Sequence, residues 1–246
     1  MVVGEFGPKD LVVEYTGRKF EPAADLAEQI EKKWAKLGWK RNDNLARLET
    51  YGLEEGKLVL TLGETDGKRY VGARDFEYLR KYGFDGIANV LAVSSVVQTA
   101  DGKILVAKRQ KGDAVGAIDG IAGNVSPGED LFAAAMREVE EETGIDVNEL
   151  KDGRVIGLVY EYGKDLCHPV MGFVFKTDLT AEQVMSRKTD EEIKVVALDK
   201  DEFVSVLLDE KQPMEPDGRL VMQLARRILI RGMTYEKQLL LKPDQI

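Results

Sequence analysis

Four glutamates crowd into one short predicted helical stretch, where Glu138, Glu140, Glu141 and Glu142 are interrupted only by Val139. At about 3.6 residues per turn, Glu138, Glu141 and Glu142 share one edge of the helix, whereas Glu140 faces solvent. Carboxylates held this close repel one another unless their pKa values rise or a cation binds between them. All-oxygen ligands suit Mg²⁺ or Mn²⁺, and Mg²⁺ often shares its coordination shell with substrate phosphates. The cluster therefore favours metal-assisted phosphoryl or pyrophosphoryl chemistry.

A charge run taken alone usually indicates only a solvated helix face, so the surrounding residues decide between the two interpretations. The stretch fits the pattern G-x₅-E-x₇-R-E-U-x-E-E-x-G-U, where U is a bulky aliphatic residue. Its positions are filled by Gly123, Glu129, Arg137, Glu138, Val139, Glu141, Glu142, Gly144 and Ile145. Average residue usage gives a chance match on the order of 10⁻⁷ in a chain of this kind. This pattern resembles the signature of the Nudix hydrolases.

The resemblance implies a fold and a reaction. We expect an α/β fold, a Nudix α/β/α sandwich with a mixed sheet over residues 87–232, preceded by a small α+β domain at residues 1–86 and followed by a tail at 233–246. Nudix enzymes hydrolyse the diphosphate bond of a nucleoside diphosphate linked to another moiety, and they use Mg²⁺ or Mn²⁺. Retention of every motif carboxylate favours a pyrophosphohydrolase over a non-catalytic nucleotide-binding regulator of the same fold.

The resemblance also assigns roles by position. Glu138, Glu141 and Glu142 would be metal ligands, with Glu129 supporting the metal shell and Gly123 offering its backbone carbonyl. Arg137 would hold the carboxylates in place through ion pairs. The general base is not fixed, because the family takes a glutamate either from the motif helix or from a later loop. Glu191 and Glu192 are the loop candidates.

Substrate specificity leaves several alternatives open. Lys108 and Arg109, at the end of a predicted strand, are candidate phosphate contacts, and Arg74 could reach the substrate from the N-terminal half. Tyr162 lies near the position of a tyrosine typical of dinucleoside polyphosphate hydrolases. The layout of the N-terminal half resembles the extension of the animal Nudix proteins that hydrolyse UDP-sugars. A UDP-sugar is therefore the first expected substrate, with dinucleoside polyphosphates and ADP-ribose as alternatives.

Hydrophobic periodicity predicts the elements that must position these residues. Turn residues Pro127 and Gly128 lead into the motif helix, which should start near residue 129 or 130 and end at Gly144. One face of this helix should pack on the sheet through Phe132, Ala135, Met136 and Val139. Further helices are expected at 22–38, 74–83, 201–210 and 218–232, and strands at 11–15, 45–53, 57–63, 88–99, 103–110, 154–162, 168–179 and 193–199.

The composition of the chain limits the kinds of partner and cellular location that we expect. The formal net charge of −9 makes the chain a poor partner for a nucleic acid polymer and leaves a small nucleotide as the expected ligand. The single cysteine, Cys167, fits a reducing cytoplasm, and no run reaches the roughly 18 apolar residues of a membrane span. His168 is the only histidine, and no Gly-x-Ser-x-Gly nucleophile elbow accompanies it, so the sequence disfavours a serine-type catalytic triad. We expect a structural role for His168. A homodimer is left open.

Overall fold

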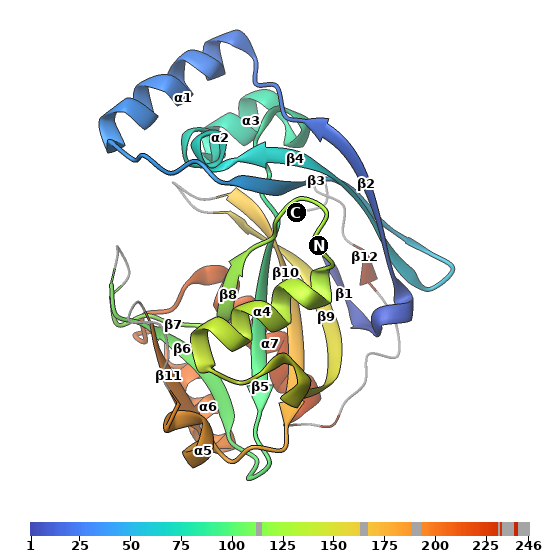
Figure 1. Cartoon of the computed structure of the whole chain (residues 1–246), viewed down its shortest axis with the longest axis vertical. Helices are drawn as coiled ribbons and strands as arrows, with labels where there is room; N and C mark the ends of the chain where they lie inside the picture. Colours follow the sequence, from blue (N-terminus) through green and yellow to red (C-terminus); the bar gives the residue numbers. More distant parts are fainter. Residues whose placement is uncertain (112–114, 163–166, 188–192, 231, 233–238, 241–246) are drawn as a thin grey trace.

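The computed structural model has a large mixed sheet between helices, with a smaller sheet and three helices above it (Figure 1). It describes residues 1–111, 115–162, 167–187, 193–230, 232 and 239–240. The predicted tail at 233–246 is thus described only at its two-residue strand. The mixed sheet, covered by helices on both faces, confirms the expected α/β fold.

Among the described residues, the larger sheet contains nine strands. They are β1 (Val2–Phe6), β5 (Ala92–Gln98), β6 (Ile104–Arg109), β7 (Ile118–Asp119), β8 (Ile121–Asn124), β9 (Leu150–Tyr162), β10 (Cys167–Thr177), β11 (Ile193–Leu198) and β12 (Leu239–Leu240). The order is β11-β6-β5-β10-β9-β1-β12, with β7 added to β6 and β8 added to β5. Only β5 and β10 pair in parallel among these strands as described, which makes the sheet mixed.

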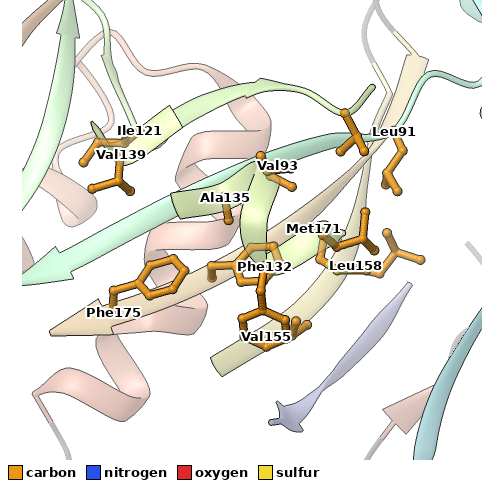
Figure 2. Packing of buried hydrophobic residues seen from close by; sticks show 14 of the residues in the cluster. Leu91, Val93, Ile121, Phe132, Ala135, Val139, Val155, Leu158, Met171 and Phe175 are labelled. Atoms are coloured by element: carbon orange, nitrogen blue, oxygen red, sulfur yellow. The ribbon is translucent and has the colours of Figure 1, made fainter. Parts of the chain in front are cut away.

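Helices cover both faces of this sheet. Helix α4 (Leu131–Thr143) packs on one face, while α6 (Lys200–Leu208) and α7 (Pro216–Leu229) pack on the other. Figure 2 shows the α4 side of the core, where Phe132, Ala135 and Val139 meet side chains of the sheet. As expected, Met136 is partly buried at the margin of the same cluster. Burying an apolar face of this kind is the main source of helix stability in a folded protein.

The N-terminal part forms a second, three-stranded sheet. Its strands are β2 (Leu11–Lys19), β3 (Asn44–Glu54) and β4 (Lys57–Asp66), in the order β2-β4-β3. Helices α1 (Ala24–Leu37), α2 (Gly67–Ala73) and α3 (Phe76–Tyr82) lie beside it. The remaining short elements are α5 (Ala181–Met185) and three 3₁₀ turns at Pro8–Asp10, Phe84–Gly86 and Val147–Glu149.

The two sheets share one hydrophobic core. Leu48, Leu60 and Leu62 of the smaller sheet belong to the same buried cluster as Phe132 and Val139 of α4. Strand β1 lies in the larger sheet, where it pairs antiparallel with β9. The predicted domain boundary near residue 86 stays a prediction, and the halves on either side of it are joined by common packing.

The junction between the halves is also hydrogen-bonded. Arg47 of β3 is 6% exposed and donates to the carbonyl oxygens of Phe84, Asp85 and Ile87 at 2.9 to 3.3 Å. Burial costs a guanidinium much of its hydration, so these three acceptors are needed to compensate. Burial accordingly lowers the pKa of Arg47, although nearby acidic groups oppose the change.

The helices and strands predicted from periodicity are confirmed, with ends shifted by a few residues. The structure adds β1, β7, β8, β12, α2, α5 and the three 3₁₀ turns, which the sequence analysis did not predict. Helix α2 contains two glycines, a composition that disfavours a helix. It forms because Asp66 caps its N-terminus and Gly72 permits close packing on α1; a Cβ there would lie 2.7 Å from Ile30 Cγ1.

Candidate active site

Helix α4 orients the motif carboxylates because both of its ends are fixed. The Asp130 side chain accepts a hydrogen bond from the Ala133 amide at 2.9 Å, and Gly144 ends the helix with φ of 71°. Such a left-handed C-cap favours glycine. Glu140 is exposed and Glu138 is buried, in agreement with the predicted faces, but Glu141 is largely exposed at the edge of the cluster.

Arg137 lies at the centre of the motif and binds several acceptors at once. Its Nε donates to Glu129 Oε1 at 2.8 Å, and its Nη1 donates to Glu138 Oε1 at 2.5 Å. Nη2 reaches the Asn124 carbonyl oxygen at 3.2 Å, while Nη1 approaches Glu141 Oε2 at 3.5 Å. Burial alone would raise the pKa of Glu129, but the hydrogen bonds from Arg137 and the Ser126 amide lower it. One guanidinium thus fixes carboxylates from the loop and from the helix.

Gly123 leaves the space in which Glu138 lies. A Cβ at this position would be 2.1 Å from the Glu138 carboxyl carbon, well inside van der Waals contact. The pKa of Glu138 is raised, chiefly by burial and further by Glu141 and Glu129, while Arg137 opposes the change. The motif glycine therefore has a steric role, in that it lets a buried carboxylate approach the strand backbone.

Glu142 faces a pocket of about 190 Å³ between the motif and the end of β6. The pocket is lined by Ala107, Arg109, Lys111, Asp119, Gly120, Ala122, Glu142 and Ile193. Glu142 Oε2 is buried and has no hydrogen-bond partner among the described residues. Burial, together with the charges of Glu138 and Asp119, raises the pKa of Glu142 to about 8, and a backbone hydrogen bond from Ala122 opposes this. An unpartnered buried carboxylate oxygen is costly, which points to a ligand at this position.

Asp119 is a second pocket carboxylate, which sequence reasoning missed. It is 3% exposed, accepts from Arg109 Nη2 at 3.0 Å and accepts from the Gly120 amide at 2.7 Å. Burial raises the pKa of Asp119, and the nearby Asp217 raises it further. The only signal in the sequence is an acidic residue inside the otherwise apolar and glycine-containing segment IDGIAG, just before the motif.

Helix α7 approaches Asp119 from the other face of the sheet. A Cβ at Gly218, in the first turn of α7, would lie 2.2 Å from Asp119 Oδ1. Partial positive charge at a helix N-terminus stabilises a carboxylate held there. Glu215, the N-cap residue of α7, lies 3.7 Å from Arg109 Nε. Asp119 and Glu215 together hold the Arg109 guanidinium at the pocket wall.

The structure brings together Gly123, Glu129, Arg137, Glu138 and Glu142, with Glu141 at their edge and Arg109 on the pocket wall. Their catalytic and binding roles stay predictions. Lys108, predicted with Arg109 as a phosphate contact, does not line the described pocket, because successive side chains on a strand alternate between its faces. The Tyr162 side chain, Glu191 and Glu192 lie outside the described residues.

Arg74 is likewise absent from the described pocket lining and lies 5.3 Å from the Tyr70 ring. Tyr70 also contacts the buried His168, whose Nδ1 lies 3.4 Å from the Tyr70 hydroxyl. Burial lowers the pKa of His168 to about 4, and the charge of Arg74 lowers it further. This environment agrees with the structural role expected for the only histidine.

The oxygen donors around the pocket match the needs of a divalent cation in chemistry, although they are not arranged around one point. Within the described part of the chain, no three His, Cys, Asp or Glu side chains already have metal-binding geometry. The chemistry nevertheless fits, because Glu142 offers an unpartnered oxygen, Gly123 makes room for Glu138, and both carboxylates have raised pKa values. Hard oxygen ligands of this kind suit Mg²⁺ or Mn²⁺.

Fold, motif and pocket together define a class of enzyme that acts on phosphorus-containing compounds. A sequence model described as the NUDIX domain matches residues 88–216 of the chain. The chain therefore belongs to the Nudix family, and its expected function as a pyrophosphohydrolase is confirmed at that level. No curated protein matches the chain.

Several solved structures resemble the fold. A Nudix hydrolase of Nitrosomonas europaea is 19% identical, with a TM-score of 0.45, and the match covers 59% of this chain and 96% of that one. The Nudix domain of Shewanella oneidensis NrtR, solved with ADP ribose, is 17% identical, with a TM-score of 0.46 and coverages of 62% and 97%. An Ap4A hydrolase of C. elegans is 17% identical, with a TM-score of 0.44 and coverages of 58% and 99%.

No helix in the described part of the chain is both long enough and apolar enough to cross a membrane.

Proposed function

We propose that this protein hydrolyses the diphosphate bond of a nucleoside diphosphate linked to another moiety, in a reaction that requires Mg²⁺ or Mn²⁺. The observation that supports this most directly is the Glu142 carboxylate. Its Oε2 atom is buried and has no hydrogen-bond partner among the described residues, and the side chain lines a pocket that also contains Arg109. A cation beside Glu142 would compensate its charge, and a substrate diphosphate would complete the shell of that cation.

The residues of the chain divide the work between metal binding and substrate binding. Glu138 and Glu142 would hold the cation, assisted by Glu141, Glu129 and the backbone carbonyl of Gly123. When bound, the cation neutralises phosphate charge and lowers the pKa of a bound water. Arg137 keeps Glu138 and Glu129 in position. Glu191, Glu192 and Glu141 remain the candidates for the general base.

Arg109 is the proposed phosphate contact. Its side chain is 45% exposed although the guanidinium is bound by Asp119 and Glu215, so Arg109 is oriented at the pocket and still accessible. Lys111 lines the same pocket and adds positive charge. Two cationic side chains beside a metal site suit a doubly charged diphosphate group.

A UDP-sugar is the first candidate substrate, on the strength of the N-terminal layout. ADP-ribose and dinucleoside polyphosphates are the alternatives. A non-catalytic nucleotide-binding protein is the competing class, and the full set of motif carboxylates argues against it. We further propose a cytoplasmic protein that acts on small nucleotides, and a homodimer is the proposed assembly state to be measured.

The experiment is a hydrolysis panel of UDP-glucose, UDP-galactose, ADP-ribose and Ap4A with Mg²⁺ or Mn²⁺, with nucleotide release measured by chromatography. Glu142→Gln should retain its fold and lose about 100-fold or more of the turnover. Glu140→Gln is the matched control, since Glu140 lies on the same helix and is exposed; it should retain full turnover. Wild-type turnover in Glu142→Gln, or no cleavage of any panel compound by the wild type, would refute the proposal.

A further inference from the structure

We propose that the N-terminal part of the chain is a positioning element for the metal-binding motif, and that it acts through the Tyr15 hydroxyl and the edge of β3. The contacts themselves are independent of any bound ligand. Their consequence for metal affinity rests on the proposed function above.

Tyr15 makes a direct contact between the N-terminal sheet and the motif. It lies on β2, and its hydroxyl donates to the Glu129 carbonyl oxygen at 2.7 Å. Its ring packs against the common core, so the hydroxyl is held in place.

The edge of β3 holds the preceding residues of the motif loop. The Ala46 amide donates to the Val125 carbonyl oxygen at 2.8 Å, and the Val125 amide donates to the Leu91 carbonyl oxygen at 3.1 Å. Leu91 in turn donates to the Ala46 carbonyl oxygen at 3.0 Å. Val125 therefore behaves as part of a short ladder between the N-terminal sheet and the strand region before β5, and its position depends on both.

These contacts lie next to the residues that orient the carboxylates. Glu129 immediately precedes Asp130, the N-cap of α4, so fixing the Glu129 carbonyl fixes the direction in which the helix starts. The Glu129 side chain accepts from the Ser126 amide at 2.9 Å and from Arg137, which also binds Glu138. A continuous set of hydrogen bonds thus runs from Tyr15 on β2 to Glu138 beside Gly123.

The hydrogen bonds from the N-terminal sheet explain how the motif loop is held in one position. The motif loop contains Asn124, Ser126, Pro127 and Gly128, a composition typical of a turn that does not define its own position. The N-terminal sheet supplies the missing constraints through one side chain and one strand edge. Binding residues held by hydrogen bonds from surrounding residues bind metal more tightly, because less order must be imposed on binding.

The test is Tyr15→Phe, which keeps the ring and removes only the hydroxyl. Tyr82→Phe is the matched control, since the Tyr82 hydroxyl donates to Asp25 Oδ2 at 2.5 Å on an exposed surface of the same N-terminal part. The first measurement is amide hydrogen exchange of Val125, Ser126 and Glu129 in the metal-free, full-length protein. The second is the affinity for Mn²⁺ alone, measured by calorimetry without substrate.

In Tyr15→Phe we expect exchange at these amides to increase about 3- to 10-fold, the range expected for the loss of one hydrogen bond, and Mn²⁺ affinity to fall by a similar factor. Tyr82→Phe should match the wild type in both measurements. Unchanged exchange in the motif loop of Tyr15→Phe, or an equal increase in both variants, would overturn the inference. A wild type that binds no Mn²⁺ would instead overturn the proposed function, while the exchange data would still decide whether Tyr15 positions the loop.

Discussion

Glu142 should destabilise the metal-free protein, and replacing it with glutamine should therefore increase stability while it removes activity. Burial and the neighbouring charges raise the pKa of Glu142 from an ordinary value of 4.5 to about 8. The folded protein keeps this proton at pH values where the unfolded chain has lost it. The free energy of unfolding therefore falls as pH rises from 4.5 to 8, because the folded state binds more protons than the unfolded state.

The size of the effect follows from the width of this pH interval. Each pH unit within it costs about 1.4 kcal/mol, so the destabilisation reaches about 4 kcal/mol at pH 8 and stays below about 1 kcal/mol at pH 5. Glutamine has nearly the same shape and no charge, so Glu142→Gln removes this dependence. At about 2 to 4 °C per kcal/mol for a chain of this size, the melting temperature should rise by about 10 °C at pH 8.

Thermal unfolding with a chelator at pH 5 and pH 8 measures this directly, with Glu140→Gln as the exposed control. We expect Glu142→Gln to exceed the wild type clearly at pH 8 and to match it closely at pH 5. Saturating Mn²⁺ should then stabilise the wild type, by about 2.7 kcal/mol at 100 times its dissociation constant, and leave Glu142→Gln nearly unchanged. Equal stability of both proteins at pH 8 without metal would show that burial and the neighbouring charges do not destabilise the ionised Glu142 carboxylate, and would refute this prediction.

Three further predictions concern the glycine and the arginine of the motif and the buried His168. Gly123→Ala should fold, because the atoms that a Cβ would clash with belong to the movable end of the Glu138 side chain. Displacement of that carboxylate should reduce turnover about 100-fold. Wild-type turnover of this variant at saturating Mn²⁺ would contradict the prediction. Arg137→Lys keeps the positive charge but cannot bind Glu129 and Glu138 at once with the fork geometry of a guanidinium. The Mn²⁺ affinity measured by calorimetry should therefore fall about 10- to 100-fold. An unchanged binding isotherm would show that Arg137 does not position the metal-binding carboxylates. Burial lowers the pKa of His168 to about 4, so as pH falls from 6.5 the unfolded chain binds a proton before the folded protein does. The free energy of unfolding of the wild type should therefore drop, relative to that of His168→Asn, by up to about 3 kcal/mol at pH 4. Parallel pH profiles of the two proteins in urea unfolding would disprove this.

Local patterns were sufficient to predict the helix that carries the carboxylates. Its apolar period, the turn residues before it and the glycine after it all act within a few residues, so α4 and its buried face could be read directly from the sequence. The exposure of Glu140 and the burial of Glu138 follow from the same periodicity. Glu141 is the exception, because its exposure depends on how far α4 tilts onto the sheet.

Contacts between distant segments could not be predicted in this way. Asp119 becomes a pocket residue only because α7 and β6 come together around it, and Tyr15 becomes relevant only because β2 passes beside the motif loop. Strand β1 is five residues long, too short for its alternation to be distinctive, and its pairing with β9 depends on the whole fold. Nothing in the local sequence indicates such partners.

The pairing of β1 with β9 also has a consequence for how the protein is made. Strand β1 emerges from the ribosome before the motif helix, whereas its neighbour β9 emerges only after that helix has been synthesised. Strand pairings between segments so far apart form late in folding, because the entropy cost of closing a long loop comes before the contacts that offset it. A nascent chain that already contains every motif carboxylate therefore lacks the finished sheet beneath them, and hydrolysis should begin only when synthesis has passed β9 and β10.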